Sequence, residues 1–330
     1  MDITKYMVDE ASIQALSEYQ IAKFFESNKP IVQENCHEAL GIAVGEPVRP
    51  TRAQGMTSYT VIAGASGKKV FQFCAPSAAL DMKIMALAKD TYGKFVPTCE
   101  ERGNMGHLLV YEMSRVWGVP LSIAQREICS INNLQLLNKT VQDLAKFFAM
   151  SWTKPTNNTP WMDTATTYTT LSQQLQALAK TLPRHLHTKL NEALDWLPVL
   201  FTPTYPQVLN HADLWEMNIH VDSRTGNIDG IVDWRYAYIG PFGLSLWGLE
   251  TLIGALGSDG WHFHAHHLEL RELFWDTLYA AANISTPFEK KAVNTGRVVG
   301  IFLAYGLIKG VPVKAGDLSL LILEKVLSLD

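Results

Sequence analysis

Four residues in the second half of the chain have the types and spacing needed to move a phosphoryl group. His211, Asp213 and Asn218 lie within one short segment, and Asp233 follows after a predicted β-hairpin. A carboxylate at Asp213 can orient an attacking hydroxyl and accept its proton. The amide carbonyl of Asn218 and the carboxylate of Asp233 are hard oxygen ligands of the kind that Mg²⁺ prefers. We therefore predict Asp213 as a catalytic base, Asn218 and Asp233 as magnesium ligands, and His211 as a support that braces the loop through its ring nitrogens.

The spacing of this segment matches the catalytic loop of protein kinases, in which a His, an Asp and an Asn stand in the pattern H-R-D-x-x-x-x-N and a metal-binding Asp follows downstream. The alternative is a polar surface loop between strands, in which Asp and Asn only form turns. We expect that simpler role for Asp222, Asn227 and Asp229. The combined pattern favours the catalytic interpretation.

The elements that must position these residues fall into two groups. The first part of the chain has a helical pattern, a hairpin of β-branched and aromatic residues, a second helix and a further short strand; the ranges are 10–27, 57–62, 70–73, 79–92 and 108–113. From about Leu134 onward the pattern is mostly helical, and no internal repeat is found. This order predicts an α+β protein with two lobes: a small strand-rich N-terminal lobe over residues 1–117 and a larger, mainly helical C-terminal lobe over residues 118–330.

Composition limits the classes of protein that this chain can be. Its 330 residues are 47% hydrophobic and 18% charged, which suits a globular protein of two lobes rather than a disordered one. With 28 basic and 32 acidic residues, the net charge of −4 argues against a general nucleic-acid binder. The four cysteines are scattered without a C-x-x-C pair, and the sequence has no signal segment or long apolar run. We expect a cytoplasmic protein with a small-molecule substrate and no membrane or nucleic-acid partner; its oligomeric state is not indicated.

The catalytic segment also carries a family resemblance. His-x-Asp-Leu-x-x-x-Asn-Ile, then Ile-Val-Asp-Trp-Arg ending at Arg235, then Gly240-Pro241, resembles the aminoglycoside phosphotransferase and choline kinase-like family. The segment from Ile239 to Glu250 resembles its fungal members, many of them linked to secondary metabolism. The resemblance implies a bilobal protein-kinase-like fold that holds ATP between the lobes and the acceptor against helices of the larger lobe. It also implies the same roles for Asp213, Asn218 and Asp233.

The resemblance further indicates which residues would contact ATP. A phosphate-covering loop is expected before the second strand, a basic residue on the third strand, and an adenine-binding hinge at Tyr111-Glu112-Met113. Along the third strand, Gln72 and Cys74 share the face opposite Phe71 and Phe73, because side chains alternate. The residues predicted to bind the nucleotide are Gly55, Thr57, Ser58, Gln72, Cys74, Glu112 and Met113.

The third strand departs from the family pattern, because neither Gln72 nor Cys74 is cationic. Lys68 and Lys69 precede the strand, where a solvated turn is the favoured interpretation over a substitute for the missing cation. Asp81, where the family pattern expects the partner acid, is equally suited to start a helix. Loss of a charge that stabilises the transferred phosphate can lower a rate by roughly 10²–10³.

Two enzymatic functions therefore stay open. The first is ATP- and Mg²⁺-dependent phosphoryl transfer to a small-molecule hydroxyl or amine in secondary metabolism. The alternative is a repurposed member that performs acid–base chemistry without phosphorylation on a small metabolite, a cationic one included. A binding protein without catalysis is least favoured, because the Asp213, Asn218 and Asp233 set is intact.

A run of histidines in Trp261-His262-Phe263-His264-Ala265-His266-His267 is the other sequence feature that suggests a metal. If the run is helical, His262 and His266 share a face, and His264 and His267 form a second pair. No Glu follows the first His of either pair, so the zinc-protease arrangement is absent. A solvated helix surface is the favoured interpretation.

Overall fold

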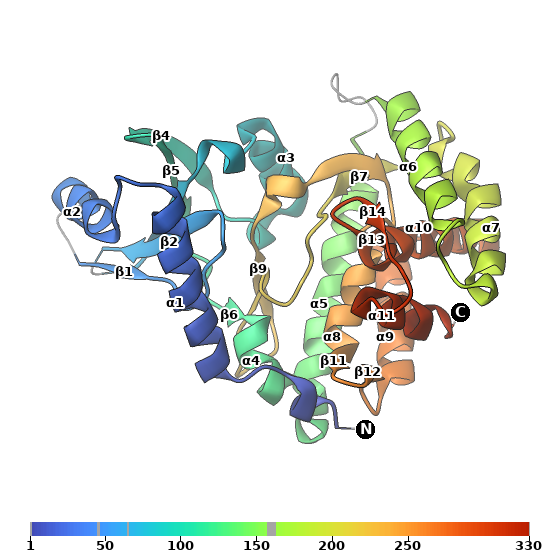
Figure 1. The fold of residues 1–330 in the computed structure, drawn as a ribbon. Helices are drawn as coiled ribbons and strands as arrows, with labels where there is room; N and C mark the ends of the chain where they lie inside the picture. Colours follow the sequence, from blue (N-terminus) through green and yellow to red (C-terminus); the bar gives the residue numbers. More distant parts are fainter. Residues whose placement is uncertain (1, 45–46, 65, 157–162, 330) are drawn as a thin grey trace.

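The computed structural model describes residues 2–44, 47–64, 66–156 and 163–329. A strand-rich region formed by the first third of the chain lies to one side, and the helices of the remainder lie to the other (Figure 1). The α+β prediction is therefore confirmed. The division at residue 117 itself stays a prediction.

The strand-rich region is built on a five-stranded antiparallel sheet in the order β1-β2-β3-β5-β4. The strands are β1 (Val48–Pro50), β2 (Ser58–Ala63), β3 (Lys69–Cys74), β4 (Cys99–Met105) and β5 (Leu108–Ser114). The helices of this region are α1 (Glu10–Ser27), α2 (Gln33–Val44) and α3 (Met82–Tyr92). The predicted hairpin of β2 and β3 is thus confirmed as the centre of a larger sheet.

Alternation along β2 and β3 divides the sheet into two faces. Tyr59, Val61, Phe71 and Phe73 are buried in one cluster with side chains of α1 and α2. Their even-numbered neighbours point to the opposite face, as period-two geometry requires. The predicted pairing of Gln72 with Cys74 on one face, opposite Phe71 and Phe73, is therefore confirmed.

The C-terminal part is mainly helical. Its helices are α4 (Leu121–Ile128), α5 (Leu134–Thr153), α6 (Thr164–Leu178), α7 (His187–Trp196), α8 (Glu250–Ile253), α9 (His267–Ala282), α10 (Pro287–Gly306) and α11 (Leu318–Leu327). Short strands lie between them: β6 (Val119–Pro120), β7 (Gln207–Asn210), β8 (Ile219–Val221), β9 (Ile228–Ile231), β10 (Tyr238–Pro241), β11 (Gly254–Gly257), β12 (Gly260–Phe263), β13 (Leu307–Ile308) and β14 (Val311–Pro312). Within the described ranges, no helix combines the length and the hydropathy needed to cross a bilayer.

Helix α10 packs unusually close to the loop that follows β10. A Cβ atom placed on Gly300 would overlap the carbonyl oxygen of Leu244, so only glycine permits this approach. The contact holds the segment after β10 against the helices, and this segment in turn supports the predicted catalytic loop.

The structure corrects the secondary-structure prediction at three places. Strand β4 was not predicted, because its sequence Cys-Glu-Glu-Arg-Gly-Asn-Met is mostly exposed and lacks apolar alternation, as suits a charged edge strand. Helix α2 was not predicted either. The histidine run is not one helix: β12 ends at Phe263 and α9 begins at His267, so His262 and His266 do not share a helical face.

Candidate active site

His211 braces the predicted catalytic loop, which runs from the end of β7 to the start of β8. Its Nε2 donates to the carbonyl of Val232 at 2.9 Å, and its Nδ1 accepts the backbone N–H of Asp213 at 3.2 Å. The ring is 1% exposed, and burial lowers the pKa of His211 to about 4. The imidazole is therefore neutral, with its proton on Nε2, and it ties the catalytic loop to the segment that ends in Asp233.

Asn218 fixes the carboxylate of Asp213. Its Nδ2 donates to the backbone carbonyl of Asp213 at 2.8 Å and to Oδ2 of the same residue at 3.0 Å. The Oδ1 atom of Asn218 accepts no hydrogen bond from the residues that the structure describes, so it is free to bind a cation. Burial and the nearby charge of Asp233 raise the pKa of the Asp213 carboxyl.

Asp233 stands at the end of β9 in the left-handed region, with φ 62° and ψ 64°. Such a backbone is rare for residues other than glycine and marks a position that the surrounding structure enforces. The side chain is exposed to the cavity described below, yet the protein around it reduces hydration enough to raise the pKa of its carboxyl. Its charge adjoins that of Asp213.

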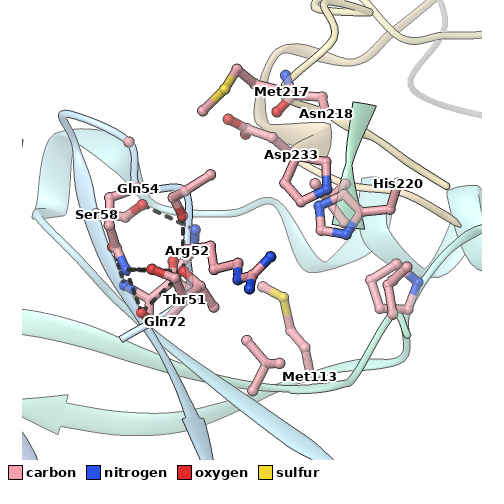
Figure 2. Close-up of a pocket in the computed structure, with 18 of the residues that line it drawn as sticks. Thr51, Arg52, Gln54, Ser58, Gln72, Met113, Met217, Asn218, His220 and Asp233 are labelled. Carbon is pink, nitrogen blue, oxygen red and sulfur yellow. Dashed lines mark hydrogen bonds between the residues drawn. The ribbon is translucent and has the colours of Figure 1, made fainter. Parts of the chain in front are cut away.

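The three oxygen-bearing side chains line one cavity of about 580 Å³ together with the inner face of the sheet (Figure 2). Figure 2 shows Asn218 and Asp233 across the cavity from Gln54, Ser58 and Gln72. Gly55 and Met113 also line it, and the Nε2 of Gln72 donates to Ser58 Oγ at 3.0 Å.

The donor set fits Mg²⁺ rather than a metal held entirely by protein. Two carboxylates and one amide line the same cavity, and Mg²⁺ usually takes one or two carboxylates and completes its shell with water and substrate phosphate. Among the described residues there is no cluster of three or more His, Cys, Asp or Glu side chains able to hold a metal. The histidines around β12 therefore form no such cluster either.

Three of the residues predicted to bind nucleotide do not line the cavity. The Thr57 hydroxyl accepts a hydrogen bond from Arg235 at 2.8 Å. Cys74 is buried against Ala78 and Tyr111, and burial raises the pKa of its thiol to about 12.

Glu112 is the third predicted nucleotide-binding residue that does not line the cavity. Its carboxylate binds Lys69 at 2.7 Å and Arg102 at 2.8 Å rather than pointing into the cavity. The ion pair with Glu112 also occupies the ammonium group of Lys69, whose side chain is 54% exposed. This lysine therefore does not replace the missing cation of the third strand. Asp81 caps the start of α3 by accepting the backbone N–H of Lys83 at 2.8 Å, as its helix-start interpretation predicts.

The sequence analysis missed the cations of this site. Arg52 and Arg115 line the cavity, and Figure 2 shows Arg52 between the sheet and the loop of Asp233. Arg52 lies outside any strand pattern, whereas Arg115 stands two residues after the predicted strand that ends at Met113, which is the one signal that pointed to it. Arg235 also acts here, because its charge lowers the pKa of both Asp213 and Asp233.

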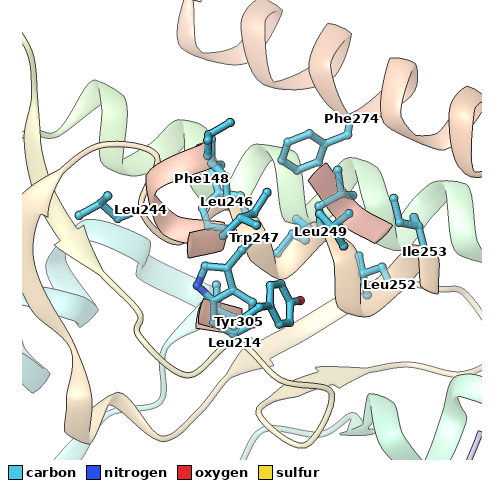
Figure 3. Close-up of a cluster of buried hydrophobic side chains, with 14 of the residues drawn as sticks. Phe148, Leu214, Leu244, Leu246, Trp247, Leu249, Leu252, Ile253, Phe274 and Tyr305 are labelled. Atoms are coloured by element: carbon cyan, nitrogen blue, oxygen red, sulfur yellow. The ribbon is translucent and has the colours of Figure 1, made fainter. Parts of the chain in front are cut away.

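The catalytic loop rests on a buried aromatic and aliphatic cluster. Leu214, the residue after Asp213, is fully buried and lies close to Trp247 and Tyr305 (Figure 3). Ser245 Oγ donates to the carbonyl of His211 at 3.0 Å. The loop is thus held from the helical side as well as from the side of β9.

Comparisons with known proteins give a family match for part of the chain and a shared fold for most of it. The model of the phosphotransferase enzyme family matches residues 136–257. A point mutant of aminoglycoside 2′-phosphotransferase-IIIa in complex with GDP is 16% identical, with a TM-score of 0.56 over 96% of this chain and 98% of that chain. A Ralstonia eutropha protein provisionally named an aminoglycoside phosphotransferase is 12% identical, with a TM-score of 0.52 over 88% and 93% of the two chains. No curated protein matches the sequence. The predicted bilobal, protein-kinase-like fold is confirmed.

Proposed function

Because the chain resembles the phosphotransferase enzyme family over residues 136–257 and has the fold of an aminoglycoside phosphotransferase, we propose that it is a small-molecule kinase that uses a nucleoside triphosphate and Mg²⁺. The observation that carries the proposal is the convergence of Asp213, Asn218 and Asp233 on one cavity. Its volume of about 580 Å³ falls within the usual range for small-molecule sites.

Asp213 is the base of the proposed reaction. The acceptor hydroxyl gives its proton to the Asp213 carboxylate while its oxygen forms a bond to the terminal phosphorus. The bond from that phosphorus to the bridging oxygen breaks, and its electron pair leaves with the nucleoside diphosphate. A raised pKa makes the carboxylate a better proton acceptor, and the hydrogen bond from Asn218 keeps it oriented.

Asn218 Oδ1 and the Asp233 carboxylate are the groups that would hold Mg²⁺. When bound, the metal neutralises charge on the phosphate oxygens. The chain itself directs the two ligands: Asn218 does so through its bonds to Asp213, and Asp233 through its left-handed backbone.

Arg52 replaces the missing cation of the third strand in this proposal. It lines the same cavity as Gln72, and its ion pair with Glu10 is long, at 3.3 Å, with both side chains about two-thirds exposed. Such exposed pairs are weak, so the guanidinium is free to turn to a phosphate. Arginine also suits phosphate geometrically, because it can donate two parallel hydrogen bonds.

Nucleotide binding tests the proposal directly. Calorimetry with ATP and with GTP, each with Mg²⁺, should detect binding, since the fold relative above binds GDP and the base preference is open. Arg52→Ala should weaken binding, while Lys68→Ala, which changes an exposed turn lysine, should not. Absence of binding at millimolar concentrations of both nucleotides would reject the kinase.

Turnover tests the role of Asp213. Asp213→Asn should lower the release of nucleoside diphosphate by roughly 10²–10⁴, the usual contribution of a general base, and leave nucleotide affinity within about twofold of wild type. Unchanged turnover would remove Asp213 from the mechanism.

The neutral Gln72 on the third strand favours a second function, acid–base chemistry on a small metabolite without phosphorylation. Product formation in the absence of nucleotide and in the presence of a chelator distinguishes it. A place in secondary metabolism rests on the sequence resemblance alone and is part of the proposal.

A further inference from the structure

A second cavity, of about 440 Å³, lies in the helical part of the protein on the other side of the catalytic loop. One face of α6, the C-terminal half of α10 and the hairpin turn at Gly310 enclose it. It reaches the catalytic loop at Ala212, and the next residue, Asp213, lines the first cavity, which we call the nucleotide cleft because the proposed nucleotide would bind there. Ser245, which hydrogen-bonds the His211 carbonyl, forms another part of its wall. We call this cavity the helical chamber.

The described residues that line the helical chamber include no Asp, Glu, Lys, Arg or His. The nucleotide cleft, in contrast, is lined by acids and arginines. The nearest acid along α6 is Asp163, and it does not line the chamber: its carboxylate caps the helix by accepting the backbone N–H of Thr166 at 2.9 Å and the Thr166 hydroxyl at 2.6 Å.

Neutral polar groups in the chamber remain available for a ligand. Thr170, Gln174 and Tyr238 line it, and none of their side chains hydrogen-bonds another residue in the described ranges. Leucines of α6 and α10, such as Leu171 and Leu303, supply apolar wall between them.

The indole ring of Trp247, which is part of the chamber wall, is not open to a cation. Trp247 is 3% exposed, and its ring packs against Trp215, with ring centroids 4.9 Å apart, and Tyr305, at 5.9 Å. A ligand ammonium in this chamber would thus give up hydration without gaining a carboxylate from the described lining, which is costly. A neutral ligand would meet apolar walls and three unpaired hydrogen-bonding groups.

We propose that the helical chamber binds the acceptor and that this acceptor is an uncharged, mainly apolar alcohol rather than a polycation such as an aminoglycoside. The inference rests on the proposed function and names its substrate class. The body of the alcohol occupies the chamber, and its reacting hydroxyl passes Ala212 to Asp213. The proton, the new oxygen–phosphorus bond and the leaving nucleoside diphosphate follow the balance given above.

Two probes that have the same shape but differ in charge test the proposal. 1-Adamantanol is neutral, whereas 1-adamantylamine is an ammonium ion at neutral pH, and both are small enough for the chamber. Calorimetry on the full chain without nucleotide should show that the alcohol binds at least tenfold more tightly than the ammonium ion. Equal binding, tighter binding of the ammonium ion, or no binding of the alcohol at millimolar concentration would overturn the proposal.

A matched pair of variants locates the binding. Thr170→Glu adds a carboxylate to the chamber at an exposed helix position, and Thr169→Glu adds the same charge one residue away, outside the chamber lining. Thr170→Glu should shift the preference toward the ammonium ion by tenfold or more, and Thr169→Glu should leave it within about twofold of wild type. An equal shift in both variants would place the probe elsewhere.

The result is separable from the kinase test. Suppose that the chain binds no nucleotide, but wild type prefers the alcohol and Thr170→Glu shifts this preference. The proposed function then fails, and the charge class of the chamber's ligand stands. If nucleotide binds and turns over but the ammonium probe is preferred, the kinase stands and this inference fails.

Discussion

The side-chain amide of Asn218 donates to both the backbone carbonyl and the carboxylate of Asp213, at 2.8 and 3.0 Å. One amide therefore has two functions in the proposed mechanism. Its nitrogen orients the base, and its oxygen is left to face a cation. Loss of this side chain should disturb both functions together, which separates it from a residue that only binds metal.

Asn218→Ala should lower turnover by roughly 10–100-fold and raise the Mg²⁺ concentration needed for half-maximal rate, because groups that orient or form a metal site contribute about this much. Steady-state rates across a Mg²⁺ titration measure both effects. Asn227→Ala is the control: its amide only donates to Thr225 in a turn, at 2.8 Å. A rate that recovers fully at high Mg²⁺ would mean that Asn218 does not orient Asp213.

Arg235 is predicted to set the pH at which the site becomes active. Its charge lowers the pKa of Asp213 and Asp233, so Arg235→Met should raise both. The base works when deprotonated, and activity is lost as pH falls through its pKa. The acid limb of the pH–rate profile should therefore move to higher pH in Arg235→Met and stay near wild type in Arg235→Lys.

Thr57→Val separates this charge effect from the hydrogen bond that Arg235 donates to Thr57. This variant removes the bond and keeps the charge, so its acid limb should coincide with that of wild type. A shift in Thr57→Val equal to that in Arg235→Met would assign the effect to position rather than charge.

Acid should destabilise the fold through two histidines. Burial lowers the pKa of His211 and of His220 from 6.5 to about 4. As pH falls from about 6.5 toward 4, the unfolded chain binds protons at these residues and the folded chain does not, so the free energy of unfolding decreases across this window. For His211 the loss between pH 7 and pH 5 should be on the order of 2 kcal/mol.

Urea denaturation at the two pH values measures this loss. His220→Gln removes one of the two groups, so the difference between pH 7 and pH 5 should become smaller without vanishing. The same difference in the variant as in wild type would show that His220 does not contribute to it.

Glu250 and Arg271 form a buried ion pair whose separate members should be intolerant of change. Two parallel bonds of 2.8 and 2.5 Å join them, and Glu250 is fully buried. Glu250→Gln leaves the arginine without its counter-charge and should lower the free energy of unfolding by about 3–5 kcal/mol. Urea denaturation measures the change.

The double variant Glu250→Leu with Arg271→Met should recover most of that loss, because replacing both charges with apolar groups removes the unpaired charge. Glu26→Gln, in the exposed pair with Lys23, should change stability little. A double variant as unstable as Glu250→Gln would point to a packing defect instead.

The sequence predicted the hairpin of β2 and β3 and the shared segment of Asp213 and Asn218, because both leave local signals. Alternation placed Phe71 and Phe73 opposite Gln72, and the spacing of Asp213 and Asn218 follows from one short loop. Charged edge strand β4 has no such alternation, so its pairing with β5 is set by the neighbouring strand rather than by its own pattern.

The cations of the cleft left no local signal. Arg52 and Arg235 come from segments far apart in the sequence, and only the folded chain brings the Arg235 guanidinium to Thr57, 178 positions away. The same reason explains Glu112: strand alternation does not reveal that Lys69 and Arg102 draw its carboxylate away from the cavity. The direction of a charged side chain such as that of Glu112 depends on its ion pairs with neighbouring strands, which the sequence does not show.

The left-handed backbone at Asp233 limits how this position can change over generations. Glycine, asparagine and aspartate tolerate such a conformation far better than other residues do. Of these, asparagine keeps the shape of the side chain and loses only its charge. Folding and the proposed cation binding thus depend on different parts of the same residue, so a single substitution to asparagine can remove the charge and keep the backbone conformation.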